Sequence, residues 1–293
     1  MPLFRMRCAR LARIIGVLVL AGCLAACSAI KLAYNNLPEV SYWWLDSYVD
    51  FDSSQTPRVR DELTQVLEWH RQNELPKVID LLRRTRTLAA DDVTPAQACE
   101  LADSIQARLL ALADRAVSAG ADVALSLSDA QLAHLERKYA RVNADYGKEW
   151  IALSPKDQRE KRYEQFLDRS EDFYGRLDAA QRDLLRRQIA QSSFDPREFD
   201  ANRRARQQEI LALLRRLLAE KAAPSDAQAA VRAFVRHVAE PTGTERERRQ
   251  SQREESCRTV AELHNQTTPA QRSKARQRLQ AYEDDLRELA SAL

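Results

Sequence analysis

The polar and apolar positions along the chain repeat with the period of an α-helix, and this pattern restarts many times. One apolar stripe, for example, runs through Ile210, Leu213, Leu214, Leu217 and Leu218. Most stripes follow a Ser, Thr or Asp whose oxygen can accept a hydrogen bond from the first helical turn. Many of these starts add a proline at the first helical position, or a Gln or Glu three residues after the cap. The starts lie at Thr56, Thr94, Ser128, Ser154, Asp178, Asp195, Ser225, Thr242 and Thr268.

These starts predict an all-α protein. Pro76 lies inside one predicted helix and should kink or divide it, because proline removes a backbone hydrogen bond and clashes with the preceding turn. The loops are short, which favours antiparallel packing of neighbouring helices. Helices of about 25 residues reach roughly 37 Å, so an elongated bundle is expected. The predicted helices span 38–51, 57–89, 95–119, 129–150, 155–175, 179–192, 196–221, 226–239, 243–266 and 269–291.

Glycine is scarce, which argues against several classes of site. The chain has six glycines, and those that follow residue 27 are far apart, whereas loops that cradle phosphate need clustered glycines. The Asn-Gly and Asp-Gly pairs of β-hairpins are absent. No Gly-x-Ser-x-Gly element or Cys–His nucleophile arrangement occurs either. We therefore assign no catalytic residue and no cofactor, and an enzyme is the least favoured function.

The first 26 residues have the pattern of an export signal: four arginines, a short apolar run at 14–20, and small residues. The segment Leu24-Ala25-Ala26-Cys27 resembles the bacterial lipobox, in which the cysteine carries fatty acyl chains such as palmitate and becomes the new N-terminus. We therefore predict a lipoprotein signal peptide over 1–26, lipidation of Cys27, and a single helical periplasmic domain over 27–293. The lipid would anchor the protein to a membrane.

Three alternatives to this assignment stay open. Cys23 ends an equally good box, although cleavage there would leave a shorter apolar run. A simply cleaved signal and a plain N-terminal helix are the other two. In lipoprotein sorting an Asp after the cysteine favours inner-membrane retention. Ser28 in that position therefore favours the periplasmic face of the outer membrane over the inner membrane.

The remaining cysteines and the charge balance narrow the chemistry further. Once the predicted signal and Cys27 are set aside, Cys99 and Cys257 remain, and two thiols in an oxidising compartment favour a disulfide. Two separate buried thiols are the alternative. Two cysteines and four scattered histidines make no metal site. Four of the 46 Lys and Arg residues precede Cys27, so the mature chain would carry 42 basic residues against 43 Asp and Glu and be nearly neutral. Nucleic acid, which favours a basic surface, is therefore not an expected partner.

An aromatic segment near the predicted anchor is the first candidate for a functional surface. It contains Tyr34, Tyr42, Trp43, Trp44, Tyr48 and Phe51. The rings could lie in the membrane interface, which Trp and Tyr favour, although several nearby acids argue against an anionic surface. They could be anchors for another protein. They could also be core, since Leu37, Val40, Trp44, Tyr48 and Phe51 share one face of the predicted helix.

His70 and Glu74 are the second candidate, because residues four apart share a helix face. Such a pair could act as a base and an acid, or supply half of a metal site. No second histidine lies within helical reach, however. A structural His–Glu pair beside the Pro76 kink is the favoured interpretation.

The N-terminal segments also resemble a known family. Cys27-Ser28, Leu32-Ala33-Tyr34-Asn35-Asn36, Trp43-Trp44-Leu45-Asp46, Trp69-His70 and Glu74-Leu75-Pro76 are similar to uncharacterised proteobacterial lipoproteins that are classified as a domain of unknown function. The likeness is best over 27–82. It implies an all-helical envelope lipoprotein and no particular activity. With the aromatic segment, it suggests an interaction surface made by Tyr34, Asn35, Asn36, Trp43, Trp44, Asp46, Tyr48, His70 and Glu74.

Two weaker resemblances concern helical periplasmic proteins. Leu127 to Gln131 and Leu177 to Gln181 resemble the Leu-Thr-x-x-Gln signatures of small periplasmic chaperones, which are themselves helix-capping boxes. Membrane-anchored lipase foldases share the general architecture, but their Arg-x-x-Phe-Asp-Tyr signature is missing here. The sequence therefore favours a lipid-anchored protein that binds an envelope protein partner without catalysis, with a client-binding chaperone as the alternative.

Overall fold

The computed structural model describes residues 30–291. Helices joined by loops make up this part of the chain, which contains no strand, and this confirms the all-α prediction. The helices are α2 (Leu37–Val49), α3 (Gln55–Asn73), α4 (Leu75–Leu88), α5 (Pro95–Ser126), α6 (Asp129–Tyr146), the π-helical turn η1 (Gly147–Ile151), α7 (Pro155–Tyr174), α8 (Ala179–Gln191), α9 (Pro196–Ala219), α10 (Pro224–Ala239), α11 (Gly243–Asn265) and α12 (Pro269–Ser291).

Most helix starts lie where the sequence predicts them. Thr94, Ser128 and Asp178 each accept a hydrogen bond from the backbone N–H three residues on, and each forms a complete capping box. Thr242 precedes α11 as predicted but makes no side-chain capping bond, and two other predicted caps are misplaced. The oxygen of Asp52, rather than Thr56, accepts the N–H groups at the start of α3. Helix α10 begins at Pro224, one residue before Ser225, because proline suits the first helical position.

Three predicted helices differ from the structure by more than two residues. Pro76 divides the predicted helix 57–89 into α3 and α4, as its missing N–H requires. Helix α5 continues past residue 119 to Ser126, where the next capping box forces a new start. Helix α6 ends at Tyr146 and passes into η1, so the regular helix is shorter than the predicted 129–150.

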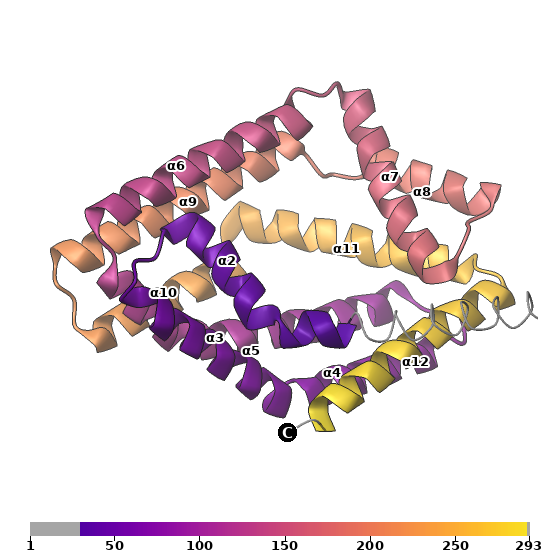
Figure 1. Cartoon of the computed structure of the whole chain (residues 1–293). Helices are drawn as coiled ribbons and strands as arrows, with labels where there is room; N and C mark the ends of the chain where they lie inside the picture. Colours follow the sequence, from indigo (N-terminus) through magenta and orange to yellow (C-terminus); the bar gives the residue numbers. More distant parts are fainter. Residues whose placement is uncertain (1–29, 292–293) are drawn as a thin grey trace, which may run out of the picture.

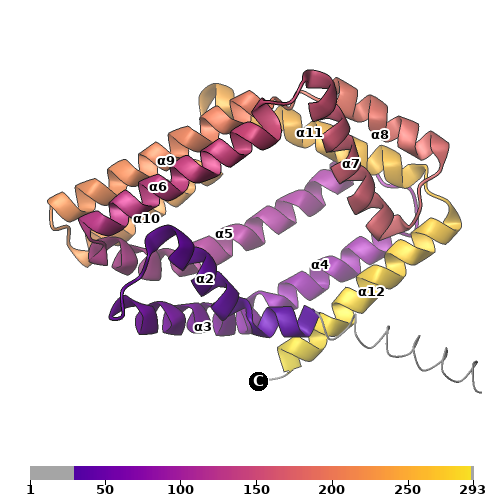
Figure 2. The ribbon, with the colours of Figure 1, turned by 45° about the horizontal axis from the view of Figure 1, so that its top comes forward.

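The most extensive helix pairs join segments that are far apart in the sequence. Helix α12 packs along α4, while α5 packs against α10 and α11. Figures 1 and 2 show α6 and α9 side by side at one end of an elongated body, and α4 beside α12 at the other. The short loops do give neighbouring pairs, such as α2 with α3 and α7 with α8. Sequence neighbours are nevertheless not the main packing partners.

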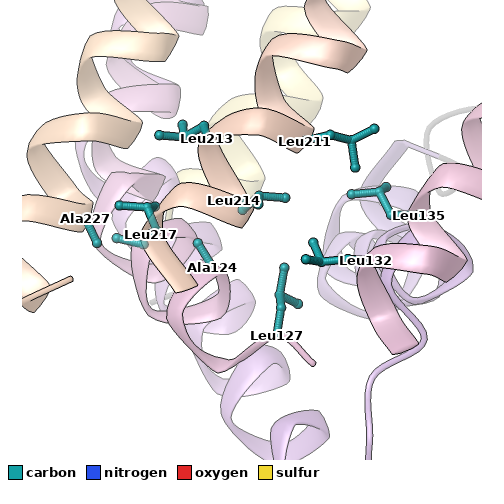
Figure 3. Close-up of a cluster of buried hydrophobic side chains, with 10 residues drawn as sticks. Ala124, Leu127, Leu132, Leu135, Leu211, Leu213, Leu214, Leu217 and Ala227 are labelled. Carbon is teal, nitrogen blue, oxygen red and sulfur yellow. The ribbon is translucent and has the colours of Figure 1, made fainter. Parts of the chain in front are cut away.

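The largest apolar cluster lies where α5, α6, α9 and α10 meet (Figure 3). Helix α9 supplies a stripe that includes Leu211, Leu214 and Leu217, and the capping-box leucine Leu127 lies beneath it. The predicted stripe of α9 is therefore core. The buried members of this cluster are Ala121, Ala124, Leu127, Leu132, Leu135, Leu211, Leu213, Leu214, Leu217 and Ala227.

Cys99 near the start of α5 forms a disulfide with Cys257 of α11, as predicted. The two residues are 158 positions apart. A cross-link over so long a loop restricts the unfolded chain strongly, which in the chain-entropy model stabilises the folded state by several kcal/mol (~2–4 in practice). The bond links the start of α5 to the interior of α11.

Two pairs of capping glutamines bind helix starts to each other. In the first pair, Gln131 at the start of α6 donates to Oε1 of Gln55 at the start of α3 over 2.6 Å. Gln131 also donates to the carbonyl of Asp50 at 3.0 Å, while Gln55 donates to the carbonyl of Ser126 at 2.9 Å. Each Oε1 accepts its own cap backbone N–H as well. We call this arrangement the first glutamine clasp.

The second glutamine clasp repeats the same pattern between α8 and α12. Gln181 donates to Oε1 of Gln271 at 2.8 Å and Gln271 donates to Oε1 of Gln181 at 3.0 Å. Each also donates to a backbone carbonyl five residues before its partner, at Gln266 and Arg176. The amide groups therefore use their donors and acceptors fully while Gln181 is 1% exposed.

We predict that the second clasp shows strong energetic coupling. Gln181→Leu or Gln271→Leu should each lower the free energy of unfolding by about 1–3 kcal/mol, because each leaves a partner amide unsatisfied in a buried site. The double variant should cost clearly less than the sum of the two singles. Urea denaturation of all three variants measures this difference.

Gln97→Leu is the matched control, since Gln97 completes the capping box of Thr94 within its own helix start. It should cost less than either clasp variant. Additive costs at Gln181 and Gln271 would contradict the coupling.

Candidate functional site

The outer side of α2 is an exposed apolar face, made by Leu37, Val40, Trp43 and Trp44. Trp43 and Trp44 are 62% and 61% exposed, and Val40 is 60% exposed. The interpretation of Leu37, Val40 and Trp44 as core is therefore wrong. Helix α2 packs on α3 and α6 by its other sides, so no helix within residues 30–291 covers these side chains. We call this surface the α2 outer face.

The inner side of α2 contains the rings that are core. Tyr42 is 5% exposed and its ring stacks with Phe51. Its hydroxyl oxygen lies 2.9 Å from Oγ1 of Thr56, at hydrogen-bond distance. Tyr48 is half-buried and packs against the main apolar cluster beside Tyr139 of α6. The aromatic segment is thus divided, with two of its rings exposed and the others packed inward.

Three polar residues of the predicted surface serve the local backbone or a neighbour. Asn35 accepts a hydrogen bond from Arg71 at 2.8 Å, and Asn36 donates to the carbonyl of Leu32 at 2.7 Å. Asp46 accepts the backbone N–H of Phe51 at 2.9 Å and so helps to end α2. These contacts shape the turn before α2 and the turn after it.

His70 and Glu74 do not pair with each other as predicted. His70 Nδ1 lies 2.9 Å from the hydroxyl of Tyr34, which is itself buried. The carboxylate of Glu74 accepts from Lys77 at 2.7 Å and from Arg108 of α5 at 3.1 Å. Lys77 and Arg108 therefore satisfy the buried carboxylate of Glu74, and His70 pairs with Tyr34 instead. Burial lowers the pKa of His70 and raises that of Tyr34.

A second tyrosine–histidine pair links α7 to α11. His264 is 3% exposed, and its Nε2–H donates to the carbonyl of Asp91 at 2.9 Å, which leaves Nδ1 to accept from the Tyr174 hydroxyl at 3.0 Å. Burial lowers the pKa of His264 and raises the pKa of Tyr174 to about 12. Both histidines are therefore held neutral by their surroundings.

An apolar groove lies between α2, α3 and α5. Its volume is about 430 Å³, and its walls include Leu45 of α2, Leu63 of α3 and Val123 of α5. The first glutamine clasp reaches this groove, because Gln55 and Ser126 line it. We call it the α3–α5 groove. Its remaining lining residues are Val49, Phe51, Ser54, Arg58, Val59, Glu62, Val66, Ala116, Ala119, Gly120 and Asp122.

A second apolar groove of about 320 Å³ lies near the other end of α5, against α4, α7 and α11. Leu101 and Ile105 of α5 face Val260 of α11 there, with Tyr174 and His264 beside them. Ile105 and Val260 are each 52% exposed. We call it the α5–α11 groove.

One stripe of α5 connects the two grooves. Ten positions, each one, three or four residues after the last, fall within an arc of about 100° on the helix. None of the charged residues of α5 lies in that arc, and Leu109, midway along, is 62% exposed. In Figure 2, α5 lies between α4 and the α6–α9 pair. The stripe consists of Ala98, Leu101, Ala102, Ile105, Leu109, Leu112, Ala116, Ala119, Gly120 and Val123.

The stripe of α5 together with its two grooves, hereafter the α5 surface, is the best candidate site in residues 30–291. It spans roughly 38 Å along the helix, and its charges lie at the rim. Arg58 pairs with Asp122 at 2.5 Å beside the α3–α5 groove, and Arg253 pairs with Asp103 beside the other. Such a surface can hold an extended apolar ligand. Sequence reasoning missed it, although the spacing in α5 carried the signal.

Two further observations bear on the predicted chemistry. Within residues 30–291, no three His, Cys, Asp or Glu side chains lie close enough to hold a metal ion, and no helix is long and apolar enough to cross a membrane. The predicted lipidation site, Cys27, lies outside the described residues. The disulfide cysteines, by contrast, lie at the α5–α11 groove, which Cys257 lines.

We predict that stability falls as the pH drops below about 6.5. An unfolded histidine has a pKa near 6.5, whereas the folded pKa of His70 and His264 is lower. The unfolded chain therefore binds more protons below pH 6.5, and the free energy of unfolding decreases by at most about 1.4 kcal/mol per pH unit for each histidine. Urea denaturation at pH 7.5, 6.5 and 5.5 measures the slope.

The His70→Gln/His264→Gln variant should be less stable at pH 7.5 but should lose less stability between pH 7.5 and 5.5. An unchanged slope in that variant would mean that other groups cause the pH dependence.

Comparison with known proteins gives one match. The model of a family of unknown function, DUF6279, matches residues 47–226, which include all of α5. Neither the curated proteins nor the solved structures contain a match to this chain. The matched range begins later and extends much further than the 27–82 over which the sequence resembled a lipoprotein family of unknown function. Because more than half of the chain matches, the protein belongs to the family of unknown function DUF6279.

Proposed function

We propose that this protein is a lipid-anchored protein of the cell envelope that binds an apolar stretch of another envelope polypeptide along its α5 surface. The observation that carries the proposal is the uncharged stripe of α5 with an apolar groove at each end. Its central residues, Ile105 and Leu109, are more than half exposed. Covering a continuous row of exposed leucine and isoleucine side chains with a partner is favourable, because it removes apolar surface from water.

The anchoring half of the proposal rests on the sequence. The lipobox-like segment ends at Cys27, and Ser28 favours the periplasmic face of the outer membrane. The Cys99–Cys257 disulfide supports an oxidising compartment such as the periplasm, because structural disulfides persist there. Acyl chains on Cys27 would hold the body at the membrane, since each buried CH₂ contributes about 0.8 kcal/mol.

The shape of the α5 surface favours a polypeptide ligand. A single row of apolar residues roughly 38 Å long matches one face of a helix of about 25 residues. An amphipathic helix can lay its apolar face in such a groove, with anchors three and four residues apart. The ion pairs Arg58–Asp122 and Arg253–Asp103 lie beside the row and can contact the polar side of that helix.

A chaperone that holds unfolded clients is the second candidate. The two separate grooves, of about 430 and 320 Å³, favour it because clients of varied sequence could occupy either one. The capping boxes at Ser128 and Asp178, which resemble the signatures of periplasmic chaperones, are formed in the structure. The two functions differ in the number of proteins that would contact one residue of the α5 surface: a single protein for a dedicated partner, and several for a chaperone.

We predict that a photo-crosslinking amino acid at position 109 forms adducts in the intact cell envelope. The same group at position 107 is the control, because Ala107 is exposed on the opposite side of α5. Adding Ile105→Glu should reduce the adduct at position 109 about tenfold, since an unpaired carboxylate would have to be buried against the partner. Adducts are measured on immunoblots after irradiation.

One adduct of fixed mass would identify a dedicated partner. Many adducts, with suppressed aggregation of a chemically unfolded test protein in vitro, would identify a chaperone. Equal adducts at positions 107 and 109, or none at 109, would contradict binding along α5.

We also predict that Cys27 carries the lipid. Cys27→Ser should abolish incorporation of radiolabelled palmitate and leave an uncleaved precursor, because acylation precedes cleavage in the lipoproteins that the segment resembles. The matched control is Cys23→Ser, which should be labelled like the wild type. Normal labelling of Cys27→Ser would contradict the assignment and show that another residue carries the lipid.

A further inference from the structure

We propose that the α2 outer face lies against the surface of the lipid bilayer, so that α2 is a second, interfacial membrane contact. This inference rests on the proposed lipidation of Cys27. The face consists of Leu37, Val40, Trp43 and Trp44, with exposed Leu32 on the preceding turn. Its occupant would be phospholipid head groups and the upper part of the acyl chains.

The distance to the anchor is the first argument. Ile30, where the described chain begins, is three positions after Cys27, and an extended chain of that length reaches at most about 10 Å. Acyl chains on Cys27 would therefore hold Ile30 within about 10 Å of the bilayer. Leu32 and the α2 outer face follow directly in the chain, so they are the exposed apolar surface nearest to the membrane.

The composition of the face is the second argument. Leu37, Val40, Trp43 and Trp44 fall within an arc of about 120° on α2. The two acids of α2, Glu39 and Asp46, lie outside that arc. Tryptophan prefers the bilayer interface, where its ring meets the acyl chains and its N–H meets water and head groups. An apolar face of this kind lies in the interface without crossing the bilayer.

The charges at the edge of the face are the third argument. The sequence alone suggested that acids would repel an anionic surface, but Glu39 forms an ion pair with Arg60 at 3.3 Å. The Arg60 guanidinium lies 5.8 Å from the centre of the Trp43 ring, and the Lys138 ammonium lies 4.9 Å from that of Tyr48. Both cations border the face, where they can contact lipid phosphates.

Quenching of tryptophan fluorescence by brominated lipid tests the proposal. The full-length acylated protein is reconstituted in vesicles of phosphatidylethanolamine and phosphatidylglycerol (about 3:1), with and without brominated phosphatidylcholine. The Trp69→Phe/Trp150→Phe variant keeps only Trp43 and Trp44. It should lose about half of its emission in the brominated vesicles, because interfacial tryptophans lie close to the upper acyl chains.

Trp43→Phe/Trp44→Phe is the matched control and should lose little emission, since Trp69 and Trp150 are half-buried in the protein. If the reporter variant does not fold, as judged by circular dichroism, the difference between wild type and this control gives the same quantity. A reporter that floats with the vesicles but keeps its full emission would overturn the interfacial contact and leave the lipid anchor intact. If the purified full-length protein carries no acyl chains and does not float with the vesicles, both the lipid anchor and the interfacial contact are overturned.

Discussion

The two glutamine clasps are the interaction on which the arrangement of helices depends. A capping glutamine ordinarily satisfies only its own helix start. Here each one also bonds to the glutamine of another start and to the backbone before it. Because these bonds are buried, breaking one leaves polar groups without partners. The clasps therefore fix where α3 meets α6 and where α8 meets α12, with little freedom to slide.

The same bonds determine the shape of the candidate site. The first clasp holds the start of α3 against the junction of α5 and α6, and so defines one end of the α3–α5 groove. The second clasp fixes the start of α12, which then packs along α4. Helix α4 in turn lines the α5–α11 groove through Thr85 and Leu88. Both grooves of the α5 surface thus depend on polar contacts made at helix ends, which lie beside the first groove and act on the second through α12 and α4.

The sequence predicts the helices well because their signals are local. The boxes at Thr94, Ser128 and Asp178 concern residues three apart, so they could be recognised without a fold. The Cys99–Cys257 bond was predictable because few cysteines remain outside the predicted signal. The pairing of Gln55 with Gln131 could not be predicted, since each looks like an ordinary capping residue.

The candidate site was harder to predict, for the same reason. Helix α2 has apolar residues on more than one side, and only the positions of α3 and α6 decide that Tyr42 is buried while Trp44 is exposed. His70 and Glu74 have the right spacing to pair, but Lys77 and Arg108 are better partners for a buried carboxylate. Ile105 and Leu109 resemble core residues in sequence. Their exposure depends on where the other helices stop.

The order of helices along the chain has a consequence for biosynthesis. Helices α4 and α5 are made early, but α10, α11 and α12, which cover them, are made last. The contacts that close the body therefore span most of the chain and form slowly. A nascent polypeptide of this kind cannot complete its long-range packing until its final segment has been made. Loss of even the last helix by truncation would uncover α4 and prevent closure.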